Sequence, residues 1–193
     1  MKMPYRYTLD FVNLNNGEWC SIIMSKDIKK LIAYFNYLGI KFNINSFEER
    51  FQIQKIAFIF KTMGMELNYN FHLWKHGPYS SSLAKDYYNI NNDNHNFNNS
   101  GYIIPEREKI ILDKFINIFD TNIIQMESAS TIMLLNLTYE DVELVEKKMK
   151  EIKPHLSDMD IINGQNKAKE LLFKDEFLTD ELKSEMMELD NID

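Results

Sequence analysis

Two histidines and an aspartate in the first half of the chain have the side chains best suited to catalysis or metal binding. His72 and His76 lie four positions apart, and Asp86 follows them. Together they could act as general acid and base in a hydrolase or nuclease. A four-residue spacing suits metal ligation on a helix, but the alternating pattern around His72 indicates a strand, which would separate the two rings. We therefore expect no metal site and keep nuclease or hydrolase chemistry as the lesser alternative.

Cysteine and serine offer two further nucleophile arrangements. Cys20 is the single cysteine, so no disulfide and no cysteine-based zinc site can form within one chain. Ser82 and Lys85 have the spacing of a serine–lysine pair, but serines that follow Gly-Pro-Tyr are typical helix caps. The six glycines are scattered singly, which argues against a glycine-rich phosphate loop. We predict no catalytic residues, no cofactor and no enzymatic activity.

Most of the net charge belongs to one end of the chain. The formal charge is −7, and residues 174–193 contribute −6 of it. Arg6, Arg50 and Arg107 are isolated, whereas phosphate-backbone binding usually rests on a clustered basic surface. Nucleic acid is therefore disfavoured as a partner, although it is not ruled out. The acidic end could instead steer a basic protein partner.

Length and hydropathy predict a folded chain without a membrane anchor. With 193 residues and 45% apolar residues, there is enough material for one core. No apolar run is long enough to span a bilayer, and the first ten residues have neither an apolar signal region nor a cleavage site. We expect a cytoplasmic protein with no membrane partner.

The elements that would position these side chains are mainly helical. The clearest start signal is Ser46 with Glu49, a capping box in which each side chain satisfies a free backbone donor of the other residue. Apolar spacing and cap residues predict seven or eight helices in a single mainly α (α+β) domain. These helices are expected at 25–38, 46–63, 80–90, 106–119, 122–136, 139–152, 158–172 and 180–189, the last five begun by Pro105, Asn122, Thr138, Ser157 and Thr179.

A small β element should interrupt the helices. Residues 66–74 alternate between apolar and polar side chains, which predicts a half-buried strand that ends at Gly77-Pro78. Residues 102–104 could return beside it as a second strand. The expected result is a two-stranded wing.

The sequence Trp-Lys-His-Gly-Pro-Tyr at residues 74–79 stands out from this background. Gly77 permits backbone conformations that other residues resist, and Pro78 fixes its own φ and restricts Gly77, so the pair forms a structural corner. Either the corner only shapes the fold, or it presents aromatic anchors to a partner. The partner-binding residues expected in the second case are Trp74, Lys75, His76, Tyr79, Lys85, Tyr87 and Tyr88.

Four sequence blocks resemble, in order, those of YwgA-like proteins, which are similar to the Panacea or SocA-like antitoxin domain. Their most specific pieces are Gln54-Lys55, Gly77-Pro78-Tyr79-Ser80, Ala129-Ser130 and Lys153-Pro154. The resemblance covers residues 46–173. It leaves residues 1–45 as an N-terminal extension with one helix packing on the core, and residues 174–193 as an acidic C-terminal helix.

The resemblance implies a non-enzymatic, antitoxin-like role. SocA-like antitoxins bind and neutralise toxins, sometimes as adaptors that deliver them to a protease. For this chain it implies a protein-interaction module, associated with a mobile genetic element or with host–virus or defence conflict, whose partner is a toxin or defence component. Self-association into a homo-oligomer stays open.

The main alternative is a DNA-binding transcriptional regulator. The two predicted strands and the short helices around them could form a winged-helix-like unit. Its phosphate contacts would come from lysines that must then share one face. Those lysines are Lys26, Lys29, Lys30, Lys55 and Lys61.

Overall fold

A computed structural model describes residues 25–92, 100–119, 122–139 and 141–172 of the chain. Within these residues the protein has seven helices and one two-stranded antiparallel sheet, which confirms the predicted mainly α class. The predicted helix at 180–189 lies outside the described residues. The elements are α1 (Lys26–Tyr37), α2 (Phe47–Thr62), β1 (His72–Trp74), β2 (Gly77–Tyr79), α3 (Ser81–Asn92), α4 (Glu106–Phe119), α5 (Ile123–Asn136), α6 (Val142–Ile152) and α7 (Asp158–Leu172).

Cap residues define the first two helices as predicted. Ser25 caps α1, and Ser46 with Glu49 forms the complete capping box at the start of α2. Gly39 and Gly64 follow the two helix ends with φ of 69° and 92°. Glycine adopts this left-handed conformation without the steric penalty of a Cβ atom.

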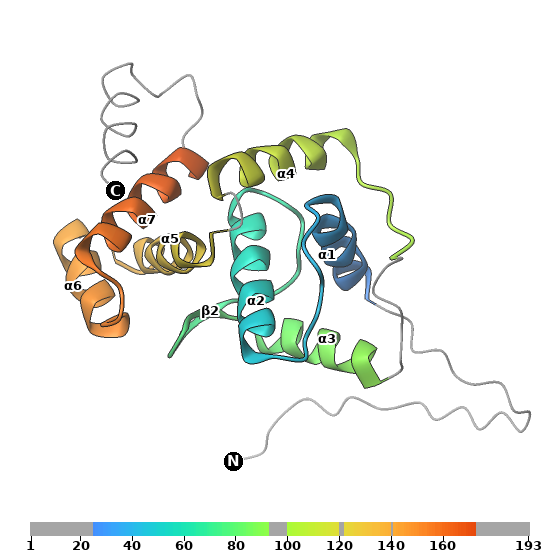
Figure 1. The fold of residues 1–193 in the computed structure, drawn as a ribbon, viewed down its shortest axis with the longest axis horizontal. Helices are drawn as coiled ribbons and strands as arrows, with labels where there is room; N and C mark the ends of the chain where they lie inside the picture. The colour runs from blue at the N-terminus through green and yellow to red at the C-terminus, as the bar shows by residue number, and fades with distance from the viewer. Residues whose placement is uncertain (1–24, 93–99, 120–121, 140, 173–193) are drawn as a thin grey trace, which may run out of the picture.

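Helix α2 is the centre of the core. In Figure 1 it runs through the middle of the molecule, with α1 on one side, α5 on the other, α4 across one end and α3 below. Its residues from Ile53 to Phe60 are all buried. Phe47 in the first turn, in contrast, is 52% exposed.

The predicted two-stranded wing was wrong in its pairing. β1 pairs with β2, placing His72 opposite Tyr79 and Trp74 opposite Gly77, so the sheet is a hairpin closed by a turn at residues 75–76. Residues 102–104 are not a strand.

The strand expected at 66–74 is observed only at His72–Trp74. In the segment before it, lysine side chains bind two of the backbone carbonyls. Leu67 and Tyr69 are buried in alternation, as the pattern predicted, but Leu73 on the same side of the expected strand is 42% exposed, so the expected burial there was wrong. Lys30 Nζ donates to Glu66 O at 3.0 Å, and Lys61 Nζ donates to Tyr69 O. These bonds occupy carbonyls that a neighbouring strand would otherwise pair.

Most later helices begin where their caps predicted, with one exception. Asn122 caps α5, and the Ser157 hydroxyl accepts a hydrogen bond from Asp160 N at the start of α7. Helix α6 begins at Val142 with Asp141 as its cap, so the predicted start at Thr138 was wrong. The Thr138 hydroxyl instead donates to Leu134 O at the end of α5.

Helices α5 and α7 pack closely at Gly164. A Cβ atom at this position would lie 2.1 Å from Ser128 Oγ of α5, so only glycine fits without a shift. Among the described residues, no helix is both long and apolar enough to cross a membrane.

A candidate binding groove at the hairpin

A cavity of about 290 Å³ opens between the first half of α2, the hairpin and α3. We call it the hairpin groove. Its size is close to the lower end of the range typical of ligand pockets. The lining residues are Phe47, Arg50, Phe51, Gln54, Lys55, Trp74, His76, Gly77, Pro78, Tyr79, Tyr87 and Tyr88.

Aromatic rings from four elements stand exposed around the groove. Phe47 belongs to α2, Trp74 to β1, Tyr79 to β2 and Tyr88 to α3. Trp74 is the most exposed, at 67%, and its ring centroid lies 6.3 Å from that of Tyr79. Single exposed rings are ordinary, whereas a cluster of them around one cavity is a feature typical of interaction surfaces.

The floor of the groove is held by side chains of α2. Gln54 binds the backbone of Ser80 in both directions, donating to its carbonyl at 3.0 Å and accepting from its N–H at 2.8 Å. Lys55 Nζ donates to Pro78 O at 2.9 Å. These buried hydrogen bonds fix the junction between β2 and α3 on α2, so the aromatic rings stand on a rigid base.

Gly77 allows the hairpin to lie directly against α5. Its φ is 87°, and an added Cβ would lie 2.5 Å from Thr131 Oγ1. Both the backbone conformation and the lack of space therefore require glycine. Pro78 follows it in a buried position, opposite Leu73 in the sheet.

A second buried polar cluster lies behind the groove. Lys153 Nζ contacts Glu127 Oε1 at 2.5 Å, and both residues are almost fully buried. His155 Nε2 approaches the same carboxylate at 3.4 Å. The Phe51 ring joins the cluster to the groove, because Lys55 Nζ lies 4.4 Å and Lys153 Nζ 5.7 Å from its centroid.

Burial and repulsion from neighbouring lysines lower the pKa values of Lys55 and His76. The pKa of Lys55 is lowered to about 7, first by burial and then by repulsion from Lys153, while Glu127 acts in the opposite direction. The pKa of His76 is also lowered, first by desolvation and then by Lys153, Lys75 and Lys55. Glu127 thus pairs directly with Lys153 and also acts electrostatically on Lys55.

The predicted partner-binding residues divide into three groups. Trp74, His76, Tyr79 and Tyr88 line the groove and are exposed. Tyr87 also lines it, but it is only 2% exposed, so the expectation that it is a surface anchor was wrong. Tyr87 points into the core because α3 repeats every 3.6 residues and the same face carries Leu83 and Ile90.

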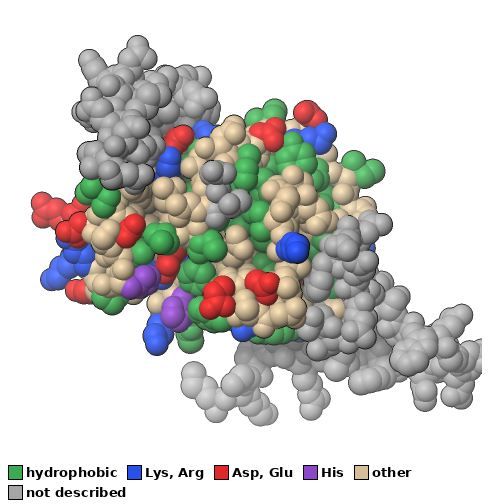
Figure 2. All heavy atoms as spheres, viewed as in Figure 1, with side chains coloured by type: hydrophobic (Ala, Val, Ile, Leu, Met, Phe, Trp, Pro, Cys, Tyr) green, Lys and Arg blue, Asp and Glu red, His purple; other side chains and the backbone are tan. Residues whose placement is uncertain are grey.

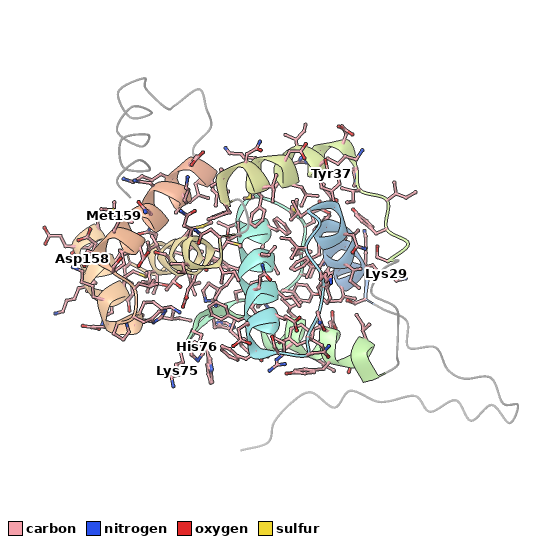
Figure 3. All side chains as sticks on the ribbon, viewed as in Figure 1. Lys29, Tyr37, Lys75, His76, Asp158 and Met159 are labelled. Carbon is pink, nitrogen blue, oxygen red and sulfur yellow. The ribbon has the colours of Figure 1, made fainter. Side chains whose placement is uncertain are left out.

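Lys75 and Lys85 are exposed but do not line the groove. Lys75 lies at the tip of the hairpin, where Figure 3 labels it beside His76. There it lines a second, more open hollow on the other side of the hairpin, with Leu73, Pro154 and His155. Lys85 lies on the outer face of α3.

The set expected for a hydrolase or nuclease does not share one cavity. His76 lines the groove and packs edge-on against Phe47, with the ring centroids 5.2 Å apart. His72 does not line it, and the Asp86 carboxylate accepts hydrogen bonds from Ser25 and Tyr69 instead. Among the described residues, no three His, Cys, Asp or Glu side chains are grouped to hold a metal ion.

The lysines expected on DNA do not form one face. Lys30 and Lys55 are each only 3% exposed. Lys30 Nζ binds Glu66 O and lies 3.9 Å from Glu108 Oε1. This pair therefore cannot contact phosphates together with Lys26 and Lys29, although the DNA-binding alternative as a whole stays a prediction.

Sequence reasoning missed several residues of the groove. Phe51 was read only as part of a helix and Arg50 only as an isolated arginine, and Glu127 gave no signal because its partner Lys153 is distant in the chain. The sequence did contain a signal for Lys55, because Gln54-Lys55 is a polar pair inside an apolar run of α2. In the structure this run is buried from Ile53 to Phe60. Such a pair must find polar partners in the core.

Comparison of the chain with protein-family models, with curated proteins and with solved structures gives no significant match. The function is therefore argued from the hairpin groove and its surroundings.

Proposed function

We propose that this chain is a non-enzymatic protein-interaction module of antitoxin type, which sequesters or neutralises a partner protein through the hairpin groove. The resemblance to YwgA-like proteins and the Panacea or SocA-like domain is part of the proposal. So are a cytoplasmic location and a toxin or defence component as partner.

The exposed aromatic cluster carries this proposal. Tryptophan and tyrosine dominate the residues that contribute most to protein–protein affinity, because they bury a large area at little cost in side-chain entropy. Trp74, Tyr79 and Tyr88 belong to this class and surround a cavity that a partner side chain can enter. A flat surface would lack that pocket.

The rigid base supports the same function. Binding is weakened when loops and side chains must be ordered on association. Here Gln54 and Lys55 already hold the backbone of Ser80 and Pro78 through buried hydrogen bonds. The groove is preorganised, so less of the binding energy is lost to ordering.

Four blocks that carry the resemblance also come together in space. Gln54-Lys55 contacts Pro78 and Ser80, and Thr131, next to Ala129-Ser130, lies against Gly77. Lys153 reaches the Phe51 ring from behind. The resemblance therefore concerns one connected region around the groove, not scattered positions.

The first test is to replace the anchors while keeping the fold. The chain is purified with its bound proteins, the candidate partner is then produced alone, and the dissociation constant is measured by calorimetry. Trp74→Ala is expected to weaken binding about 30-fold or more, the size of an interface hot spot. Tyr88→Ala should act in the same direction.

Ile110→Ala is the matched control, because Ile110 is 64% exposed on α4, away from the hairpin. It should leave the dissociation constant unchanged, and circular dichroism should show that all three variants fold. If Trp74→Ala and Tyr88→Ala bind as tightly as the unaltered chain, the groove is not the binding surface. If the partner is toxic to a host, neutralisation should fail with Trp74→Ala and persist with Ile110→Ala.

A further inference from the structure

We propose that the hairpin groove receives an acidic segment of the partner protein, with a carboxylate side chain placed against Arg50, Lys55 and His76. This inference rests on the proposed function and adds the chemistry of the partner. The anchoring rings would hold an apolar neighbour of that carboxylate.

The groove wall carries basic side chains and no acidic ones. Arg50, Lys55 and His76 line it, and no aspartate or glutamate among the described residues does so. The lowered pKa of His76 favours its neutral ring, so the positive charge comes from Arg50 and Lys55, and His76 adds a polar ring nitrogen. Glu48 and Glu49 stand next to Phe47 in the sequence, but they are not part of the wall. At the lower left of Figure 2, histidine and basic side chains lie beside hydrophobic atoms, with acidic side chains next to them, and Figure 3 labels Lys75 and His76 there.

The buried side chains behind the wall also include more basic groups than acidic ones. Lys55 and Lys153 are both buried, and among the described residues that contact Lys153 only Glu127 is anionic. Repulsion between the two lysines helps to lower the pKa of Lys55. A carboxylate arriving from the groove would offset this repulsion, whereas a cationic side chain would increase it.

Lys55 has donors to offer such a carboxylate. Within the described residues its ammonium donates one hydrogen bond, to Pro78 O, out of the three N–H groups that it carries when protonated. Arg50 donates to Ile44 O through Nη1, which leaves the rest of its fork-shaped group for the groove. Hydrogen bonds between such cations and a carboxylate are among the strongest in proteins.

A protein segment fits better than a small molecule because the surface continues past the cavity. Trp74 and His76 line both the groove and the second hollow on the other side of the hairpin. That hollow adds Leu73, Lys75 and His155, and also one acidic residue, Glu151, which pairs with Lys148. An extended chain lying across the hairpin could use both hollows, with apolar contacts from the rings and charge contacts from the basic groups.

Selection from a random peptide library displayed on phage tests this directly. The complete chain is immobilised, and selection is repeated with Trp74→Ala to recognise peptides that depend on the groove. We expect these peptides to be enriched in aspartate or glutamate next to an aromatic or large apolar residue. Depletion of lysine and arginine should accompany this enrichment.

Matched variants then locate the charge contact. In a selected peptide, replacing the glutamate by glutamine should weaken binding about tenfold or more. Lys55→Met should cause a similar loss of affinity for the glutamate peptide, so that the glutamate and glutamine peptides bind alike. Lys109→Met on α4 is the control, and with it the glutamate peptide should still bind more tightly than the glutamine peptide. If Lys55→Met does not fold, Arg50→Met and His76→Asn together serve the same purpose.

The outcomes separate this inference from the proposed function. Groove-dependent peptides that are basic or uncharged would overturn the acidic partner and keep the binding module. Recovery of no groove-dependent peptide would count against both. The acidic end of the chain itself is a competing occupant of the groove. If it fills the groove, the complete chain will not bind the peptides, and removal of residues 174–193 will raise peptide affinity about tenfold.

Discussion

Lys55 combines two effects that oppose each other energetically. Its ammonium is buried, which costs free energy, and its neighbour Lys153 repels it, so the pKa is lowered to about 7. Yet the amine also fixes Pro78 O and faces the groove. Residues that reduce stability while serving a binding site are a common feature of functional surfaces.

Stability should depend on pH through Lys55. The pKa of lysine in an unfolded chain is about 10.4, so between pH 7 and 10 the folded state holds fewer protons at this residue. The contribution of Lys55 to the free energy of unfolding is therefore fully present above about pH 10.4. It is lost as the pH falls toward 7, by up to about 1.4 kcal/mol per pH unit.

Urea unfolding of Lys55→Met and of the unaltered chain between pH 7 and 9 measures this effect. Loss of the hydrogen bond to Pro78 O affects the variant at every pH, so the test is the trend: the free energy of unfolding of the variant minus that of the unaltered chain should be highest at pH 7 and should fall as the pH rises. Lys109→Met, at an exposed site, should show no such trend. Parallel pH profiles for Lys55→Met and the unaltered chain would contradict the lowered pKa.

At the scale of elements, one buried ion pair connects α5 to the segment between α6 and α7. Glu127 lies in the first half of α5, and Lys153 caps the end of α6. Their contact of 2.5 Å is almost fully buried, unlike the surface pair of Lys148 with Glu151. Buried pairs and surface pairs respond very differently to the loss of one partner.

Glu127→Gln should destabilise the fold by about 3 kcal/mol or more, because the buried charge of Lys153 then loses its counterion. Glu151→Gln should cause no measurable loss, because its side chain is exposed. Thermal unfolding of both variants measures the difference. Glu127→Gln should also lower the pKa of Lys55 further, since Glu127 raises it. Equal stability of the two variants would show that the buried pair does not hold these elements together.

At the scale of the whole molecule, the charges of the chain are separated. Residues 174–193 carry −6 of the total charge of −7, whereas the groove wall is basic. The acidic end predicts attraction of a basic partner, and the groove predicts an acidic one. Long-range fields act mainly on association rates and fade with salt.

Removal of residues 174–193 should separate these two influences. The formal charge would change from −7 to −1, and the described helices should remain folded because their own buried residues already form a continuous core. Stopped-flow measurements at low salt should show faster association of acidic peptides and slower association of a basic partner. Rates that do not change in either case would remove any steering role of this range.

Sequence alone determined the parts of this protein that depend on neighbours along the chain. Ser25, Ser46 and Asn122 cap helices because a side chain meets backbone donors only two or three residues away. The special conformation of Gly77 was visible for the same local reason. Periodicity likewise indicated the central position of α2.

Only the tertiary structure decided which of these parts meet. Residues 72–74 pair with 77–79 and not with 102–104, and Lys30 and Lys61 bind the backbone carbonyls of Glu66 and Tyr69 in the segment before the hairpin. Phe47 stayed exposed, and Lys55 came to lie near Lys153 and Glu127. These outcomes depend on contacts between residues far apart in sequence, whose burial and electrostatic energies no local pattern encodes.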